Sequence, residues 1–558
     1  MSYSQQYLGR SRLTEAAGGQ QLSLSPNLTR DKVFFEGELK HPIRFREAMS
    51  ALHEVVVGDL KAKPRDRSAW EAYKVELAAR EARIFQAASN QAEVQALHEH
   101  PEAPPKDLKR RFKDAHAKYF GARARWIRDL YEKDSKLWWL LDPVVTAAPD
   151  AVLFECFSLD ESSYACLTVD REAFSHQDHS NRGLGTTNVD YSWALYEQFQ
   201  KLRSYRPTQL AVDPTGFEID VSGSTGYREE KIDLPASWLR GFGQIQAAQM
   251  LPATALRLPR ETLYGLLAAL ERRREKTGPR AIRFDLVPGG HCRVVLEPWE
   301  LEVKCPGRVH EASVEQTVRV WGRRRLEVLA RLLPLIESVD LYLLGSGLPS
   351  IWVARLGEMS FTLALSGWTN NDFTSGANLE LLAGQLESVA EVEASVAREL
   401  REARLMNLSQ LNQRVGAHVP RHLLTSALFQ LALRGQAIYD HARQVYRFRE
   451  VLPEAIAIDL ARVNPELDAA RRALREGSVH LARSESIGGA RLLLAGRVGG
   501  TECEALLDAD GIFKKGQCNC SFFYKNRLRR GPCRHLLALK LKASPPPLGG
   551  PSPIRVAP

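Results

Sequence analysis

Four residues near the C-terminus have the types and the spacing that suit a metal ion. Cys518 and Cys520 are two residues apart, and Cys533 and His535 follow as a second pair after a loop of twelve residues. Cysteines two apart project to the same side of an extended strand, so the first pair can bind one ion together. Three thiolates and one imidazole complete a tetrahedral shell, which suits structural Zn²⁺ and leaves no position for a catalytic water. The alternative is four unconnected buried or reactive side chains, and the spacing favours zinc.

The second pair of ligands requires the start of a helix. Residues two apart do not face each other inside a helix, so Cys533 and His535 cannot both act from a helix interior. Gly531-Pro532 ends the incoming loop. We therefore expect Cys533 at the cap, and His535 in the first turn, of a helix from Arg534 to Lys542.

This pattern resembles the SWIM zinc finger, whose motif is Cys-x-Cys, a variable loop, Cys-x-His and an apolar helix. The match includes Leu536-Leu537-Ala538-Leu539 in the helix and two upstream strands, expected over 490–494 and 504–507. The resemblance implies DNA or RNA binding. It implies, as the alternative, a protein adaptor or regulatory subunit. The chain looks more like the long bacterial SWIM proteins that accompany ATPases, including MoxR-type ATPases with von Willebrand A-domain partners, than like the helicase relatives or transposases that carry this finger.

The positive charge of the chain is concentrated around these ligands. The net charge is +9, but from Gly511 onward there are ten Lys and Arg residues and no Asp or Glu, so the preceding 510 residues sum to −1. Such a patch attracts a polyanion or an acidic protein, although it can also be a solvated surface that keeps the domain soluble. The aromatic run Phe522-Phe523-Tyr524 could add stacking on bases. The residues that we expect to contact nucleic acid or a partner are Lys514, Lys515, Lys525, Arg527, Arg529, Arg530 and Arg534.

Length and composition indicate a protein of several domains, each with an apolar core. A chain of 558 residues predicts about three to five domains, and 44% apolar with 26% charged residues supports packed cores. Met1–Leu13 is too polar for a secretory signal, and no apolar run reaches the length of a membrane helix. The five remaining cysteines, Cys156, Cys166, Cys292, Cys305 and Cys503, are too sparse for a disulfide framework. We therefore expect a cytoplasmic protein that does not contact a membrane.

The expected fold class is α+β multidomain. The segments are a loose N-terminus (1–30), a mainly helical region (31–148), an α+β body (149–385), a winged-helix-like module (390–455), the zinc-finger domain (477–545) and a Pro/Gly-rich tail (546–558). In the body, Ala151–Phe157 and Tyr164–Val169 are expected to form a hairpin. Helices near Tyr191, Arg260 and Arg324 each precede an antiparallel ribbon, which suggests a repeated unit, but the unequal spacings leave the repeat a hypothesis.

The winged-helix-like module is predicted from element order. A helix, a short helix, a longer helix from Pro420 to Arg434 and two strands occur in the order of a winged helix-turn-helix. The longer helix is mostly Leu, Ala and Phe, so it is a poor candidate for reading bases. Arg443, Arg447 and Arg449 in the ribbon are better placed for phosphate. A protein-docking or structural role is the alternative for this module.

No catalytic motif emerges from the sequence. There is no phosphate loop, His-Glu-x-x-His or nucleophile elbow. His176, Asp178 and His179 lack a fourth ligand and are expected in a solvated loop. Cys156 and Cys166 lie roughly opposite each other across the expected hairpin and are interpreted as core thiols. The sequence therefore predicts a non-enzymatic, zinc-containing binding protein.

Overall fold

The structure is a computed structural model that describes the chain in segments, the longest gap between them being 59–142. It describes residues 35–58, 143–175, 236–273, 280–306, 315–367, 390–416, 418–450, 464–487, 491–508 and 511–543, with shorter pieces at 5–6, 12–16, 19–24, 183–188, 202–205, 208–212, 230–231, 372–373 and 382. These residues belong to one of the two compact units of the chain, Met1–Leu60 with Leu140–Pro558. Most of the predicted helical region and the whole predicted tail lie outside the described residues.

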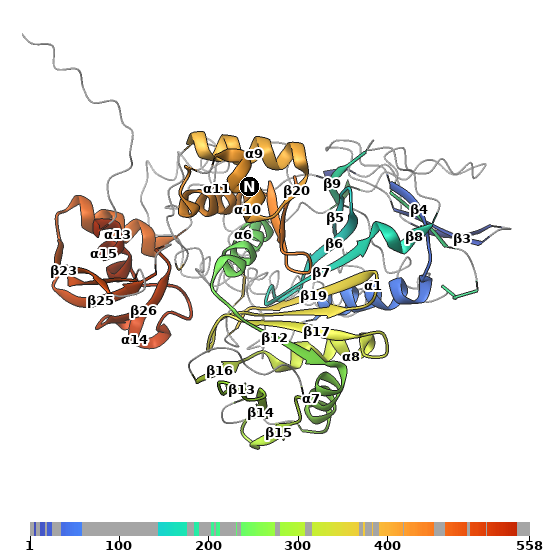
Figure 1. Ribbon diagram of the computed structural model, residues 1–558, viewed down its shortest axis with the longest axis horizontal. Coiled ribbons are helices and arrows are strands. Elements are labelled where there is room, and N and C mark those ends of the chain that lie inside the picture. Colours follow the sequence, from blue (N-terminus) through green and yellow to red (C-terminus); the bar gives the residue numbers. More distant parts are fainter. Residues whose placement is uncertain are drawn as a thin grey trace, which may run out of the picture. The chain divides into compact units, whose positions relative to one another are not determined.

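An eight-stranded antiparallel sheet forms the centre of the body. Its order is β12-β17-β18-β19-β7-β6-β5-β9. The strands are β5 Val144–Ala147, β6 Ala151–Phe157, β7 Ser163–Asp170, β9 Gly185–Asn188, β12 Thr254–Pro259, β17 Ser338–Leu343, β18 Ser350–Arg355 and β19 Met359–Leu365. The predicted hairpin is confirmed as β6–β7, and Figure 1 shows its place among the other strands.

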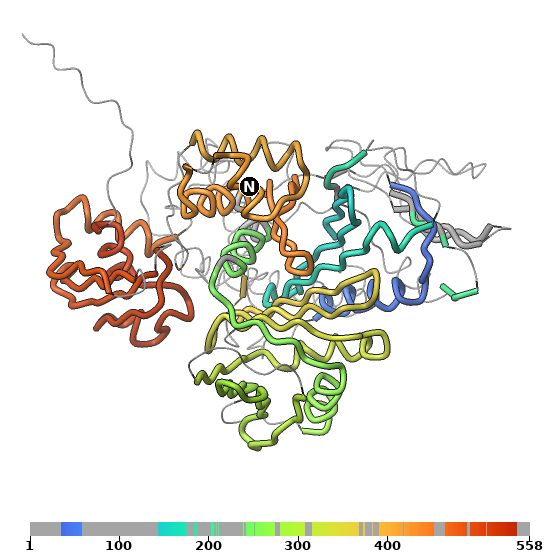
Figure 2. Tube along the Cα trace, in the orientation of Figure 1, coloured from blue at the N-terminus to red at the C-terminus, as the bar shows by residue number. Residues whose placement is uncertain are grey.

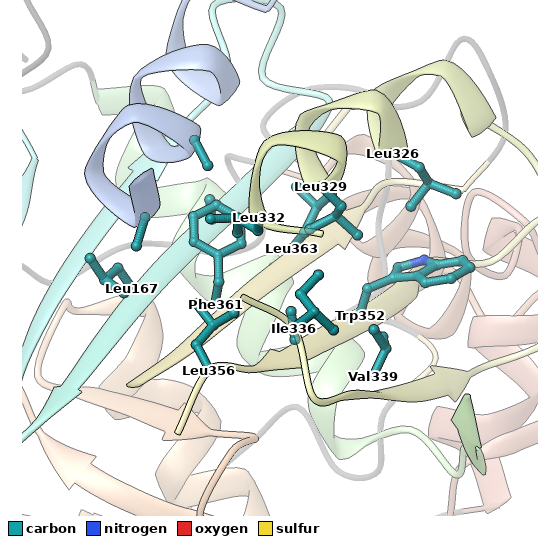
Figure 3. Packing of buried hydrophobic residues seen from close by; sticks show 14 of the residues in the cluster. Leu167, Leu326, Leu329, Leu332, Ile336, Val339, Trp352, Leu356, Phe361 and Leu363 are labelled. Atoms are coloured by element: carbon teal, nitrogen blue, oxygen red, sulfur yellow. The ribbon is translucent and has the colours of Figure 1, made fainter. Parts of the chain in front are cut away.

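Both faces of this sheet are buried. Every residue of β6 and β19 is buried, as expected for strands that are covered on both sides. One face packs against α1 (Pro42–Val56), the 3₁₀ turn η2 (Arg323–Val328) and α8 (Leu329–Leu332). Figure 3 shows Leu329 and Leu332 of α8 over Phe361 of β19. Each such side chain contributes roughly 1.5–3 kcal/mol by leaving water.

The opposite face of the sheet packs against α6 (Ala236–Met250). Phe242 and Ile245 of this helix are buried against Phe157 and Tyr164. The rings of Phe157 and Phe242 meet edge to face, with centroids 5.1 Å apart. The large sheet is therefore the middle layer of the body.

A four-stranded antiparallel sheet adjoins the body through α7 (Arg260–Arg272). Its order is β15-β14-β13-β16, with β13 Ile282–Leu286, β14 Arg293–Leu296, β15 Leu301–Val303 and β16 Gln316–Val320. Buried and half-buried residues alternate along β13, because only one face of this sheet lies on the core. The strands after α7 thus form a separate sheet, whereas those after α8 join the eight-stranded sheet, so the suggested repeat does not recur as one packing unit.

The helix predicted from Arg324 to Ser338 is mostly wrong. The chain there forms η2, the short α8 and then β17 from Ser338. Arg325 in η2 is 5% exposed, and its guanidinium reaches the carbonyl of Ser162 and the hydroxyl of Ser366. Because these partners are distant in sequence, local helix propensity could not reveal them.

Smaller sheets complete the N-terminal part. A five-stranded sheet has the order β2-β3-β10-β4-β8, and β1 pairs with β11. Their bounds are β1 Gln5–Gln6, β2 Arg12–Ala16, β3 Gly19–Leu24, β4 Phe35–Leu39, β8 Phe174–Ser175, β10 Thr208–Val212 and β11 Glu230–Lys231. Three short strands therefore lie in the segment that was expected to be loose.

The helical module after residue 390 has the predicted order of elements. Its elements are α9 Ala390–Ala403, β20 Leu405–Met406, α10 Leu408–Val415, α11 Arg421–Leu433, β21 Ala437–Asp440 and β22 Val445–Phe448. Asn407 starts α10 through a capping box with Gln410. Val396, Leu411 and Leu428 pack in the module's own core.

The ribbon arginines are not available for phosphate, which corrects the prediction. The Arg447 guanidinium donates to both carboxylate oxygens of Asp150, at 2.6 and 2.8 Å, and to Asp440. Arg449 donates to Glu155 at 2.6 Å. Arg447 and Arg449 are completely or almost completely buried. Arg443 pairs with Asp150 and Asp170.

The C-terminal domain is a four-stranded antiparallel sheet with helices. Its sheet order is β23-β24-β25-β26, with β23 Val479–Ile487, β24 Arg491–Val498, β25 Thr501–Leu507 and β26 Phe513–Cys518. The helices are α13 Pro465–Arg475, α14 Ser521–Asn526 and α15 Arg534–Ala543. Leu536 and Leu539 of α15 pack with Leu494 and Ala505 of the sheet. Figure 2 follows the chain through these elements at the red end of its colour scale.

None of the helices in the described ranges is long and apolar enough to cross a membrane.

Candidate metal centre

The four predicted ligands meet at one point of the C-terminal domain. One ligand atom from each of Cys518, Cys520, Cys533 and His535 lies within 4.8 Å of all the others. Cys518 ends β26, Cys520 is the N-cap of α14, and Cys533 and His535 flank the first residue of α15. The predicted cluster is thereby confirmed as a group that could hold a metal ion.

The spacing of these atoms fits a tetrahedral zinc site. The Cys518 Sγ lies 3.6 Å from the His535 Nδ1. Zinc bonds of roughly 2.3 Å to sulfur and 2.0–2.1 Å to nitrogen, at tetrahedral angles, place two such ligand atoms about 3.6 Å apart. Three sulfurs and one nitrogen form a donor set typical of structural zinc. All four positions of the shell would then be filled by the protein.

Backbone geometry explains how each pair of ligands is positioned. Cys520 has an extended backbone, with φ −78° and ψ 155°, and its sulfur accepts a hydrogen bond from the Phe523 amide at 3.3 Å. Gly531, with φ +91°, turns the chain ahead of Pro532. The Gly531-Pro532 signal in the sequence therefore located the start of α15 correctly. The short helix α14 between the pairs was not predicted.

Among the three thiols of the cluster, Cys518 is the one whose ionised form is favoured. Hydrogen bonding to Cys533, with a contribution from His535, lowers the pKa of the Cys518 thiol to about 4. Hydrogen bonding to Cys518, together with burial, raises the pKa of Cys533. A metal ion that binds there displaces the protons that the thiols carry.

A fourth cysteine adjoins the cluster without belonging to it. Cys503 of β25 is directly opposite Cys518 of β26. Burial raises the pKa of Cys503 to about 12, and its thiol donates to the carbonyl of Gly496. Cys503 therefore stays a neutral thiol. Local sequence pattern did not indicate its proximity, because it comes from another strand.

Two of the predicted contact residues are held by carboxylates. Arg534 donates from its backbone amide at 2.7 Å, and from its guanidinium at 2.7 and 3.2 Å, to the carboxylate of Glu466 in α13. Lys514 pairs with Asp508 at 3.2 Å. Glu466 thereby also accepts from the amide at the start of α15, so its ion pair with Arg534 joins α13 to α15.

Three cations remain exposed. Lys515, Lys525 and Arg527 are exposed, and none of them forms an ion pair with a carboxylate in the described part of the chain. Arg529 and Arg530 are half-buried. A groove of about 510 Å³ is lined by the cations Lys514, Lys515, Arg527 and Arg529, with Phe523 and Leu528 among its apolar residues.

The aromatic run divides between core and surface. Phe523 is buried in the core of the domain, and the Arg527 guanidinium lies 5.5 Å from the centre of its ring. Tyr524 is 77% exposed, beside Lys525. Tyr524 is therefore the aromatic side chain that could stack on a base.

Other sequence candidates give no second site. Cys156 and Cys166 are buried and, as predicted, lie in the core. Cys156 pairs with Ala165, and Cys166 pairs with Glu155, so the two thiols are one residue out of register and on opposite faces of the sheet. His176, Asp178 and His179 lie outside the described residues.

Comparisons with known proteins do not assign the chain to a family. No protein-family description matches it, and no curated protein matches it. Among solved structures, the proliferating cell nuclear antigen of Entamoeba histolytica is 12% identical, covers 41% of this chain and 90% of its own, and has a TM-score of 0.28. The corresponding protein of Thermococcus kodakaraensis is 12% identical, covers 43% and 96%, and has a TM-score of 0.27. Similarity of this order assigns neither a fold nor a function.

Proposed function

We propose that this protein is a non-enzymatic nucleic-acid-binding protein whose C-terminal domain is a SWIM-type zinc finger. One Zn²⁺ held by Cys518, Cys520, Cys533 and His535 ties both ends of the segment between the ligand pairs. Its shell is closed, so the metal has a structural and not a catalytic role.

The observation that carries this proposal is the set of exposed cations on the segment that the ligands enclose. Lys525 and Arg527 lie on α14 and at its end, and Lys515 lies on the strand that leads to Cys518. Fixing these residues around a metal before a ligand arrives lowers the ordering entropy of binding. Their charge favours a polyanion, and exposed Tyr524 supplies a stacking surface.

The module of α9 to β22 has a different role in this proposal. Its order of elements resembles a winged helix, but its ribbon arginines are engaged with Asp150 and Glu155. We assign it a structural role in the body and place the nucleic-acid contact in the C-terminal domain.

The test is a salt series with a triple variant. Fluorescent single-stranded and duplex oligonucleotides are titrated with the full-length, zinc-loaded protein and with Lys515→Ala/Lys525→Ala/Arg527→Ala. Removing one cation that binds a phosphate reduces the slope of log K against log salt by roughly 0.7–0.9. We expect the triple variant to bind more weakly and with a slope smaller by about 2.

A matched control separates charge from folding. Arg483→Ala and Arg497→Ala remove exposed cations from β23 and β24 that are paired with glutamates, and both variants should bind like the wild type. If the wild-type protein with full zinc content binds neither oligonucleotide, the nucleic-acid proposal is wrong and the adaptor alternative leads.

A further inference from the structure

Two cysteines outside the metal cluster lie face to face in the four-stranded sheet of the body. Cys292 precedes β14 and Cys305 follows β15. The register pairs Val294 with Val303, and continuing it by two residues toward the open end of this hairpin sets Cys292 opposite Cys305. The Cys292 thiol is hydrogen-bonded to Cys305, so the two sulfur atoms are in contact.

This placement has the geometry that a disulfide needs. Directly opposite residues of an antiparallel pair have Cα atoms about 4.5–5.5 Å apart and side chains on the same face. A disulfide requires Cα atoms roughly 4.4–6.8 Å apart. The two sulfurs can therefore be joined without moving the strands.

The other buried cysteines lack this arrangement. Cys156 and Cys166 are adjacent in the β6–β7 hairpin, but one packs on the α1 side of the large sheet and the other on the α6 side. The sheet itself separates their sulfurs. Chain proximity alone would favour Cys156 and Cys166, whereas strand register favours Cys292 and Cys305.

The pair lies at the rim of the core. Cys292 is 5% and Cys305 is 8% exposed, and their neighbours His291, Arg293 and Lys304 are exposed. β15 has three residues and is an edge strand of its sheet. A short edge strand opens locally at low free-energy cost, which gives a small reagent access to both sulfurs.

We propose that Cys292 and Cys305 are a site of reversible oxidation, forming a disulfide by exchange with a small oxidised thiol such as glutathione disulfide. The Cys305 thiolate attacks one sulfur of glutathione disulfide, which releases one glutathione and leaves a mixed disulfide. The Cys292 sulfur then attacks Cys305 Sγ, its proton passes to solvent, and the second glutathione leaves. Two electrons pass from the cysteine pair to glutathione disulfide, and two molecules of glutathione are formed.

The order of attack follows from the hydrogen bond between the thiols. Hydrogen bonding to Cys305, together with burial, raises the pKa of the Cys292 thiol, so Cys292 is the poorer first nucleophile of the two. The resulting bond would join the open end of the β14–β15 hairpin. It would fix the short edge strand to its neighbour, where backbone pairing is limited to three residues.

The experiment equilibrates the full-length, zinc-loaded protein overnight in buffers of increasing ratio of oxidised to reduced glutathione. Free thiols are then blocked by alkylation, and the protein is digested and mapped by mass spectrometry. We expect a peptide pair joined through Cys292 and Cys305, two hydrogens lighter than the reduced peptides. Its ratio of crosslinked to reduced form should exceed the ratio for Cys156 with Cys166 by roughly tenfold or more in each buffer, a difference of about 30 mV or more in potential.

The single variant Cys292→Ser provides the matched control. It removes the resolving thiol, so Cys305 should accumulate a mixed disulfide with glutathione that the wild type does not retain. The wild-type crosslink is measured independently of this variant. Absence of the Cys292–Cys305 crosslink at the most oxidising ratio, or equal crosslinking of Cys156 with Cys166, would overturn the proposal.

Discussion

Four cysteines lie in the neighbourhood of His535. Three of them form the candidate metal cluster with it, and the fourth, Cys503, does not. Cys518, Cys520 and Cys533 have ligand atoms within 4.8 Å of each other and of the imidazole. Cys503 lies across from Cys518 but directs its thiol to a backbone carbonyl of β24. A protonated thiol with its own acceptor does not compete for zinc.

The first prediction uses this difference. Protein purified without added metal should contain one zinc ion per chain by elemental analysis, because the four ligands complete one shell. Cys518→Ser/Cys520→Ser should lower the zinc content to near zero, whereas Cys503→Ser should keep it. Full zinc in the double variant would place the ion elsewhere.

At this scale the sequence predicted the Cys and His cluster but not the ion pairs of the basic residues around it. The ligands are local, since a strand end and a helix start fix each pair. Arg534 and Lys514 were expected at a partner surface, but Glu466 and Asp508 bind them. These carboxylates precede the basic segment, so counting charges within that segment could not reveal them.

At the scale of elements, buried ion pairs join β22 to the large sheet. Arg449 and Glu155 both have side chains at most 1% exposed, and Tyr164 also donates to the same oxygen of Glu155. The Arg449 guanidinium lies 4.0 Å from the centre of the Phe242 ring of α6. Three elements therefore depend on one charge pair.

The second prediction concerns this pair. Arg449→Met leaves a buried carboxylate without its cation and should lower the free energy of unfolding by about 3–5 kcal/mol in urea titrations. Adding Glu155→Gln removes the orphan charge and keeps an acceptor for Tyr164, so the double variant should regain most of the loss. A double variant no more stable than Arg449→Met would show that the ion pair is not the cause.

The third prediction concerns acid. His441, between β21 and β22, is buried beside the rings of Tyr342 and Tyr439, and burial lowers its pKa to about 4, against a small opposing effect of Asp440. In the unfolded chain His441 binds a proton below about pH 6.5, whereas in the folded chain it does so only below about pH 4. Stability should therefore fall across this window as pH falls, by about 2 kcal/mol at pH 5.

The measurement compares urea unfolding at pH 7 and pH 5 in the wild type and in His441→Phe. The phenyl ring can occupy the aromatic site without titrating, so the variant should lose less stability between the two pH values. An unchanged difference would assign the acid sensitivity to other groups.

The order of elements could be predicted where the local sequence pattern determines it. The contacts between residues that are distant in sequence could not. The β6–β7 hairpin, α7, α11 and α15 follow from periodicity and from Pro and Gly positions. Arg447 and Arg449 were expected to be available for phosphate because their acidic partners, Asp150 and Glu155, precede them by about 300 residues. The helix predicted after Arg324 is shorter in the structure, where buried Arg325 contacts Ser162 and Ser366. No local pattern indicates these contacts.

At the scale of the whole molecule, the proposed metal site and the core of the body lie in different parts of the chain. The body has its own core, in which α1, α7 and α8 pack on two sheets. In the C-terminal domain, the cluster joins β26, α14 and α15, whose apolar residues pack in a core that extends to Ala248 of α6 and Phe429 of α11. Structural zinc contributes roughly 10–16 kcal/mol in finger peptides, which is as large as the whole net stability of a typical domain, about 5–15 kcal/mol.

The fourth prediction follows from this division. A chelator should make the segment from α13 to α15 sensitive to protease and leave the core of the body resistant. Because α13 packs on α15 and is tied to it by Glu466 and Arg534, the first cleavage sites should lie at or before α13, giving a fragment that ends near residue 464. Limited proteolysis with mass spectrometry, with and without chelator, measures the boundary.

Restoring zinc should restore protection, and Cys518→Ser/Cys520→Ser should give the chelated pattern without chelator. Equal resistance with and without metal would mean that the apolar core alone holds the domain, whereas simultaneous cleavage throughout the body would mean that the body depends on the zinc domain for its own stability.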